Sequence, residues 1–339
     1  MQPGDLFDRF VVDAILGRGG ATSVYRVRDP REGKIYALKV VSAADRAAVS
    51  NLEREGRILA RLDHPNLLAA HAVVRHDSRV GVALEFVDGP DLRHWIDDVR
   101  PDLALAIEVF HGVVRGLTVV HKAGLVHCDL KPENILLAVD GDAPLPKIGD
   151  FGLVTSTGQR IDNVVGTARY LAPESWNVPR AADPRSDLFG LGCILYEIVC
   201  FRPAFNGPNP DSVRKLAAAK AYPRPDRLSP GLPVGIVDLI DLLLDPDPNR
   251  RAADCQAVLD TLDRQDLLHR LAYLPPLPVR TTGRTGWEGE ISPGSVQTPG
   301  LAQDRQASAS AVSWMLLLLP ISLLVFGLAI ALMTAAMTG

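Results

Sequence analysis

Apolar and polar positions alternate along several stretches near the start of the chain, a period typical of β-strands. Residues 10–16 and 24–28 carry β-branched and aromatic side chains in this way, on either side of a glycine-rich turn. Residues 34–41 continue the alternation, and residues 79–86 form a more continuously apolar run. These four segments predict strands.

A helical period follows in residues 49–68, where Leu52, Leu59 and Leu62 fall on one face. Glu55 lies on that same face, and a carboxylate on a buried face needs a partner. Lys39, inside the apolar run 34–41, could be that partner. The pattern leaves open the alternative that Glu55 lies at the edge of the stripe and reaches water. A second helix is predicted over residues 104–122.

The C-terminal end has a different pattern. No charged residue follows Arg305, and residues 314–337 form an apolar run that exceeds the ~20 residues needed to cross a bilayer. We expect a transmembrane helix there, because soluble helices of this length usually keep a polar face. Residues 273–313 are rich in Pro, Gly and Ser and predict a flexible linker. The expected domains are therefore a folded domain over 5–272, the linker, and the membrane helix.

Composition adds two exclusions. The chain has 339 residues, 47% of them hydrophobic, and a net charge of -4, so no overall positive field favours nucleic acid. Its four cysteines include no C-x-x-C pair, which gives little support to a zinc or redox centre. We expect Cys193 and Cys200, which lie in an apolar stretch, to be core residues. The N-terminus has no apolar segment typical of a signal peptide.

The turn between the first two strands contains Gly17, Gly19 and Gly20, which would allow the backbone to approach a phosphate closely. Thr22 occupies the place of the third glycine in G-x-G-x-x-G, and no Gly-Lys-Ser/Thr follows. Taken alone, the turn is a weak signal, because a glycine-rich hairpin is more often only a hairpin.

Two stretches, "GLVHCDLKPENILL" (124–137) and "PKIGDFGLV" (146–154), carry the candidate chemistry. Asn134 and Asp150 offer the hard oxygen ligands that Mg²⁺ prefers. Asp129 could orient a hydroxyl group and accept its proton, and Lys131 could neutralise a transferring phosphoryl group. Together these residue types predict phosphoryl transfer from a nucleotide.

With these stretches in place, the chain resembles a bacterial serine/threonine protein kinase of the eukaryotic (Hanks) type over nearly all of residues 5–272. The matching motifs occur in the family's order: Gly17-x-Gly19 with Val24, Ala37-Leu38-Lys39, Glu55, His127-Cys128-Asp129 with Asn134, Asp150-Phe151-Gly152, Ala172-Pro173-Glu174, Asp187 and Arg251.

The resemblance implies an α+β fold with two lobes, a β-rich N-lobe (about 5–86) with one main helix and a helical C-lobe (about 90–272). It implies ATP and Mg²⁺ as cofactors, with Mn²⁺ as an alternative, and protein substrates. Catalytic roles would fall to Asp129, Lys131, Lys39 and Glu55, and metal binding to Asn134 and Asp150. ATP would contact Leu16, Gly17, Gly19, Val24, Ala37, Lys39, Glu85, Val87 and Leu136. Thr167, Glu174, Asp187 and Arg251 would position the substrate or brace the fold.

The chain departs from the family at Cys128, which replaces an arginine that clamps a phosphate on the activation segment in many members. Since Cys carries no positive charge, we expect activity not to depend strictly on phosphorylation there. Thr155, Ser156, Thr157 and Thr167 remain candidate phosphosites. A redox-sensing thiol is a second interpretation of Cys128, which the adjacent Asp129 disfavours. We expect His127 to be a core residue that takes no part in proton transfer.

The expected function is a protein kinase on the cytoplasmic face of the inner (plasma) membrane, held by a single span with no sensor domain beyond it. The lipid bilayer would be a partner, and self-association through the span is left open. Two other interpretations compete: a nucleotide-binding pseudokinase scaffold, and a small-molecule phosphotransferase. The second would lack Lys131-Pro132-Glu133 and Ala172-Pro173-Glu174, which are both present.

Overall fold

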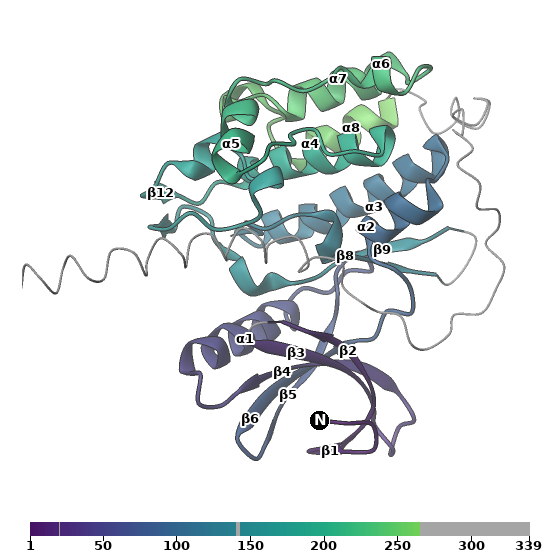
Figure 1. Ribbon diagram of the computed structural model, residues 1–339, viewed down its shortest axis with the longest axis vertical. Coiled ribbons are helices and arrows are strands. Elements are labelled where there is room, and N and C mark those ends of the chain that lie inside the picture. The colour runs from purple at the N-terminus through teal and green to yellow at the C-terminus, as the bar shows by residue number, and fades with distance from the viewer. Residues whose placement is uncertain (20, 140–142, 265–339) are drawn as a thin grey trace, which may run out of the picture. The chain divides into compact units, whose positions relative to one another are not determined.

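The computed structural model describes residues 1–19, 21–139 and 143–264. Its first lobe is a six-stranded antiparallel sheet with one long helix beside it (Figure 1). The strand order is β1-β2-β3-β4-β6-β5. The elements are β1 (Leu6–Phe7), β2 (Phe10–Arg18), β3 (Thr22–Arg28), β4 (Ile35–Ser42), α1 (Arg46–Leu59), β5 (Ala70–His76) and β6 (Arg79–Glu85).

Both faces of this sheet are covered. Phe7, Phe10 and Leu38 belong to a buried cluster on one face. On the other, α1 presents Leu52 and Leu59 to the main core of the molecule. The helix lies so close to β6 that a Cβ at Gly56 would come within 3.1 Å of Val82. This close packing fixes the height of α1 above the sheet, and with it the position of any side chain that the helix points inward.

The second lobe is mostly helical (Figure 1). Its helices are α2 (Leu92–His94), a π-helical turn (Trp95–Val99), α3 (Leu103–Lys122), α4 (Pro184–Cys200), α5 (Pro210–Ala218), α6 (Pro225–Leu228), α7 (Val234–Leu243) and α8 (Cys255–Arg264). Short strand pairs lie between them: β7 (Leu125–Val126), β8 (Ile135–Ala138), β9 (Leu145–Ile148), β10 (Thr155–Ser156), β11 (Arg160–Ile161) and β12 (Arg180–Ala181). The 3₁₀ turns are Pro132–Asn134, Phe151–Leu153, Ala168–Tyr170, Pro173–Trp176 and Pro248–Arg250.

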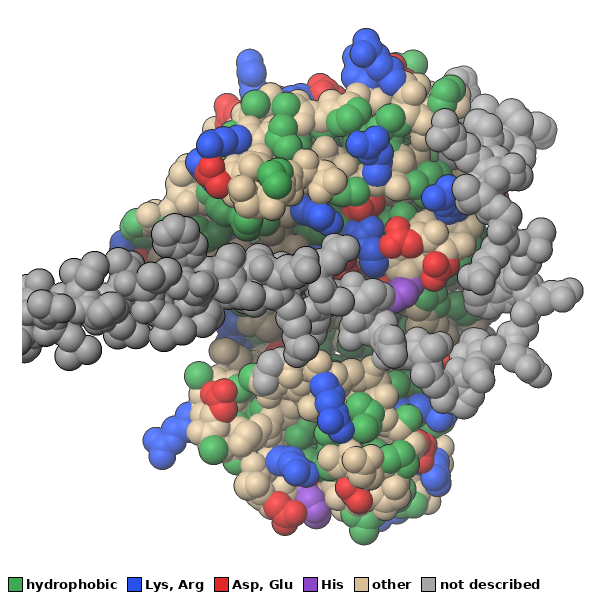
Figure 2. All heavy atoms as spheres, in the orientation of Figure 1, with side chains coloured by type: hydrophobic (Ala, Val, Ile, Leu, Met, Phe, Trp, Pro, Cys, Tyr) green, Lys and Arg blue, Asp and Glu red, His purple; other side chains and the backbone are tan. Residues whose placement is uncertain are grey.

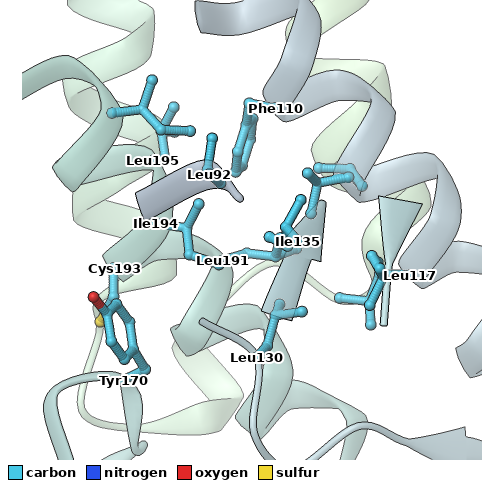
Figure 3. Close-up of a cluster of buried hydrophobic side chains, with 14 of the residues drawn as sticks. Leu92, Phe110, Leu117, Leu130, Ile135, Tyr170, Leu191, Cys193, Ile194 and Leu195 are labelled. Atoms are coloured by element: carbon cyan, nitrogen blue, oxygen red, sulfur yellow. The ribbon is translucent and has the colours of Figure 1, made fainter. Parts of the chain in front are cut away.

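Helices α3 and α4 form the centre of this lobe. Figure 3 shows side chains of both helices meeting Leu92 and Ile135 in a buried cluster. A glycine allows a close approach to α3: a Cβ at Gly116 of this helix would lie 2.6 Å from the carbonyl oxygen of Asn66. Among the described residues, α3 is the one helix long and apolar enough to cross a membrane, and 61% of its most apolar window is buried within the chain.

The predicted strands and the helix over 104–122 are confirmed, the latter as α3. One detail differs. Helix α1 ends at Leu59, so Leu62 lies beyond it, although its side chain is still buried. The predicted linker and membrane helix lie outside the described residues. On the face drawn in Figure 2, basic and acidic side chains are interspersed over both lobes, in keeping with the near-balanced net charge.

Candidate active site

An ion-pair cluster links the two lobes at Lys39. Its ammonium nitrogen lies 2.9 Å from a Glu55 oxygen and 3.0 Å from Oδ1 of Asp150. Strand β4 supplies the lysine, α1 the glutamate and the segment after β9 the aspartate. Burial by itself lowers the pKa of Lys39, but the charges of Glu55 and Asp150 outweigh that effect and raise it. The open question about Glu55 is therefore settled: its carboxylate is buried and paired with Lys39.

A second cluster is centred on the carboxylate of Asp129. Lys131 donates to Oδ2 at 2.8 Å, and the backbone N–H and hydroxyl of Thr167 donate to Oδ1 at 2.9 and 2.8 Å. Lys131 also donates to the Thr167 hydroxyl oxygen at 2.9 Å. The amide nitrogen of Asn134 donates to the backbone oxygen of Asp129 at 2.8 Å. Both carboxylate oxygens thus have fixed donors, so the side chain is held in one orientation.

The loop that carries Asp129 is fixed from behind by Asp187. This carboxylate, 3% exposed, accepts the backbone N–H groups of His127 and Cys128 at 2.7 and 3.0 Å. Its Oδ2 also lies 2.9 Å from Nε2 of His121. Burial acts to raise the pKa of Asp187, but these hydrogen bonds and the nearby histidines lower it. The carboxylate is therefore ionised and holds the loop through its main chain.

His127 is fully buried, as expected for a core residue. Its Nε2 lies 3.1 Å from the backbone oxygen of Gly149, and its ring meets Phe151 edge-on at 5.2 Å. Cys128 has a left-handed backbone with φ of 68°. Burial, together with the charge of Asp187, raises the pKa of the Cys128 thiol to about 12. The thiol is thus protonated near neutral pH, which also disfavours a redox-sensing role.

The segment from Asp150 to Glu174 is held by main-chain contacts. Strand β10 pairs with β7, and β11 pairs with β12. Thr155 is buried at 8% exposed, whereas Ser156 and Thr157 are exposed. Gly166 has φ of 107°, and a Cβ there would lie 2.7 Å from the backbone oxygen of Cys128. This glycine therefore lets the segment approach the loop that carries Asp129 (residues 127–134, below called the catalytic loop after the family resemblance) closely enough for Thr167 to reach that carboxylate.

The segment ends on a buried ion pair. Arg251 donates to both carboxylate oxygens of Glu174 at 2.7 Å, and Ser186 donates to the same carboxylate at 3.0 Å. The side chain of Arg251 is fully buried. Asp187 thus braces the loop that carries Asp129, and the pair of Glu174 and Arg251 braces the end of the segment.

The predicted ATP contacts lie on elements that border the two clusters. Leu16, Gly17, Gly19 and Val24 belong to or flank the β2–β3 hairpin, and Ala37 lies on β4. Glu85 ends β6, Val87 follows it, and Leu136 lies on β8. Ala37, Val87 and Leu136 pack against the main core. In this connection between the lobes, Glu85 also forms an ion pair of 2.9 Å with Lys147 of β9.

The residues predicted to bind metal fit a magnesium ion shared with a nucleotide. Among the described residues, nothing donates to the side-chain oxygen of Asn134, since its nitrogen is the group that contacts Asp129. Asp150 supplies a carboxylate. No group of three or more His, Cys, Asp or Glu in the described part of the chain could hold a metal alone. Mg²⁺ commonly takes one or two protein ligands and completes its shell with phosphate and water oxygens.

Sequence reasoning missed two residues of this region. Arg93 of α2 contacts Glu197, Glu133 and Tyr170. His121 bonds to Asp187 and also lies 3.4 Å from the sulfur of Cys255. Nothing local in the sequence marks either one, since their partners are distant in the chain. The position of His121 near the end of α3, just before the catalytic loop, was the only available signal.

Comparison with known proteins gives consistent matches. The protein kinase domain family matches residues 10–261. A probable serine/threonine-protein kinase of Streptomyces coelicolor is 32% identical over 269 residues, covering 75% of this chain and 39% of the relative. The serine/threonine-protein kinase PknL of Mycobacterium tuberculosis is 34% identical over 265 residues, 75% of this chain and 64% of the relative.

PknE, a serine/threonine-protein kinase of the same organism, is 31% identical over 300 residues. That alignment covers 83% of this chain and 52% of PknE. The chain therefore spans less than two thirds of the length of each of these three relatives. The family match, in contrast, covers most of this chain and includes both residue clusters. The chain belongs to the protein kinase family.

Proposed function

We propose that this chain is a serine/threonine protein kinase, which transfers the γ-phosphoryl group of ATP to Ser or Thr hydroxyl groups of proteins. The observation that carries the proposal is the fixed carboxylate of Asp129, with Lys131 and Thr167 bonded to its two oxygens. A base held in this way needs no reorganisation when a substrate hydroxyl arrives. The names of the relatives, all serine/threonine kinases, support the choice of substrate hydroxyl.

The residues of the two clusters have separate roles in this proposal. Asp129 orients the substrate hydroxyl and accepts its proton. Lys131, 2.8 Å away, offsets the charge that develops on the transferring group. Lys39, held by Glu55, contacts the α- and β-phosphates. Asn134 and Asp150 would hold Mg²⁺, or Mn²⁺ as an alternative. The bound metal neutralises phosphate oxygens.

The remaining assignments concern the nucleotide. The apolar side chains of Leu16, Val24, Ala37 and Leu136 would enclose the adenine, and the backbones of Glu85 and Val87 would bond to its edge. Gly17 and Gly19 would cover the phosphates. These assignments rest on the resemblance, on the pairing of Val24 with Lys39 between β3 and β4, and on the place of Glu85 and Val87 at the connection between the lobes.

The test is transfer of labelled phosphate from ATP to a protein substrate such as casein. Asp129→Asn removes the base and should lower the rate by about 10²- to 10⁴-fold. Lys39→Met should abolish detectable transfer. Asp13→Asn and Lys34→Met are the matched controls, since both residues form ion pairs at the surface of the first lobe, with Lys34 exposed and Asp13 partly buried.

The outcomes separate the competing functions. Nucleotide binding without any transfer by the wild type would identify a pseudokinase scaffold. Transfer to small alcohols or amines but never to protein would identify a small-molecule phosphotransferase. Transfer to protein that survives Asp129→Asn unchanged would contradict the proposed base.

Activity should not depend strictly on phosphorylation of the segment. Cys128 offers no charge to clamp a phosphate, and the segment is already paired with β7 and β12. Autophosphorylation of the exposed Ser156 and Thr157 remains compatible with this. Replacing Thr155, Ser156 and Thr157 together by Ala should leave most of the rate intact. A collapse of the rate in a folded triple variant would contradict this regulation while leaving the kinase assignment in place.

The kinase domain should face the cytoplasm, held at the plasma membrane by residues 314–337. The support is their apolar composition and the need of the domain for cytosolic ATP. Expression of the full chain and of a chain ending at residue 313, followed by membrane fractionation, tests the anchor. The full chain should sediment with membranes and the shorter chain should not. Crosslinking of the two forms would show whether the span also promotes self-association.

A further inference from the structure

Arg93 of α2 contacts three other parts of the second lobe at once. Its two terminal nitrogens each lie 2.9 Å from an oxygen of Glu197, a bidentate pair. Its Nε lies 3.2 Å from Glu133, and one terminal nitrogen also donates to the hydroxyl of Tyr170. That hydroxyl donates in turn to Glu197 at 2.7 Å.

These partners belong to the site described above. Glu133 lies inside the catalytic loop, between Lys131 and Asn134. Tyr170 ends the 3₁₀ turn that begins directly after Thr167, and its backbone N–H donates to the Thr167 oxygen at 2.9 Å. One guanidinium group therefore touches both of the segments that meet at Asp129.

The cluster is held rigidly by its surroundings. Glu197 is 1% exposed and Tyr170 is 7% exposed. The Tyr170 ring lies at the edge of the buried cluster drawn in Figure 3. Leu92, next to Arg93, is fully buried, and Asp91 accepts the His94 N–H at 2.8 Å to start the helix. The direction of the Arg93 side chain is thus set by its own helix.

Charge favours the same arrangement. Burial by itself lowers the pKa of Arg93, but the hydrogen bonds to Glu197 and the neighbouring negative charges raise it far above its ordinary value. Burial and the charge of Glu197 raise the pKa of Tyr170, so its hydroxyl keeps its proton as a donor. A planar guanidinium can serve a bidentate carboxylate and two further acceptors together, which a lysine ammonium cannot do.

We propose that Arg93 is a positioning residue for phosphoryl transfer, which sets the register between the catalytic loop and the activation segment through Glu133 and Tyr170. The inference rests on the proposed kinase function. Tyr170 is joined to Thr167 by a backbone hydrogen bond of 2.9 Å, so holding Tyr170 with Arg93 and Glu197 supports the position of Thr167 against Asp129. Loss of these hydrogen bonds should weaken binding of the protein substrate and slow phosphoryl transfer. ATP binding, which uses Lys39 and Glu55, should not change.

The experiment uses the full-length chain with casein and ATP, and measures kcat and KM for each substrate. Tyr170→Phe removes only the hydroxyl and preserves the buried ring. Arg93→Met removes the guanidinium, and Arg93→Met with Glu197→Gln avoids leaving an unpaired buried carboxylate, so that the protein still folds. Arg28→Met, which removes an exposed arginine paired with Asp13 in the first lobe, is the control.

Tyr170→Phe and the double variant should lower kcat/KM for casein about tenfold or more, with the KM for ATP unchanged and thermal unfolding close to wild type. Arg93→Lys should recover only part of the loss. Unchanged kcat and casein KM in these folded variants would overturn the inference, as would an equal rise in the KM for ATP. Absence of transfer by the wild type would instead overturn the kinase assignment, and the inference with it.

Discussion

Arg251 and Glu174, 77 residues apart in the chain, form a bidentate ion pair in which each terminal guanidinium nitrogen lies 2.7 Å from one carboxylate oxygen. The arginine also donates to the backbone oxygens of Asp245 and Arg185 at 2.8 and 2.7 Å. The pair thereby joins the end of the activation segment to α4 and to the turn after α7.

Arg251→Met should lower the free energy of unfolding by about 3 kcal/mol, because it leaves a partly buried carboxylate without its partner. Arg214→Met breaks an exposed arginine–aspartate pair on α5 and should cost about 0.5 kcal/mol or less. Urea unfolding of both variants measures the difference. Equal midpoints for the two variants would mean that the buried pair contributes no more than a surface one.

Asp187 predicts a pH dependence of stability. Its pKa is lower in the folded protein than the ordinary 3.8. Such a carboxylate stabilises the fold above the unfolded pKa and loses that contribution as the pH falls through the folded value. The stability difference between wild type and Asp187→Asn should thus be full at pH 6 and shrink below about pH 3.8. Urea midpoints from pH 6 to pH 3 test this, and a constant difference would refute it.

Two glycines offer a matched pair of substitutions. Gly166 and Gly158 both have positive φ, at 107° and 79°, but a Cβ at Gly158 meets nothing within 4 Å. Both alanine substitutions should lower the free energy of unfolding by about 1 kcal/mol, because alanine disfavours a positive φ. Only Gly166→Ala also collides with the Cys128 carbonyl, so it should displace Thr167 and lower kcat about 10²-fold. Similar kcat values for the two folded variants would show that the close approach is not needed.

The Cys128 thiol should be chemically inert. With a pKa of about 12, its thiolate fraction near neutral pH is about 10³-fold below that of a free cysteine. Iodoacetamide should therefore label Cys128 far more slowly than free cysteine, and brief peroxide treatment should affect wild type and Cys128→Ser equally. Mass spectrometry of the labelled peptide gives the rate. Rapid labelling of Cys128 in the folded protein would revive the redox-sensing interpretation.

The pattern of apolar and polar residues predicted those strands and helices that have one buried, apolar face and one more polar face. Burial alternates along β4, at the start of β2 and at the end of β3, and α1 buries one face, so their burial follows the expected periods there. The pattern also placed Glu55 on that face, and the kinase resemblance paired it with Lys39. The 2.9 Å contact between them confirms this pairing.

Other features could not be predicted in this way. In α4, every residue from Asp187 to Cys200 is buried, so no polar face marks its orientation. Strands β7 and β10 have two residues each, too few for any period. The Arg93 cluster depends on partners up to 104 residues away, which come together only when the second lobe is folded.

The main-chain pairing of the activation segment has a consequence for control. The N–H of Thr157 donates to the Gly124 oxygen, and the N–H of Ala182 donates to the Gln159 oxygen, both at 2.8 Å. Both bonds join main-chain groups. A kinase or phosphatase that acts on a nearby side-chain hydroxyl therefore adds or removes none of their donors or acceptors. We therefore expect the main chain of the segment to keep its order whether or not Ser156 or Thr157 is phosphorylated, so control of the rate would have to act elsewhere.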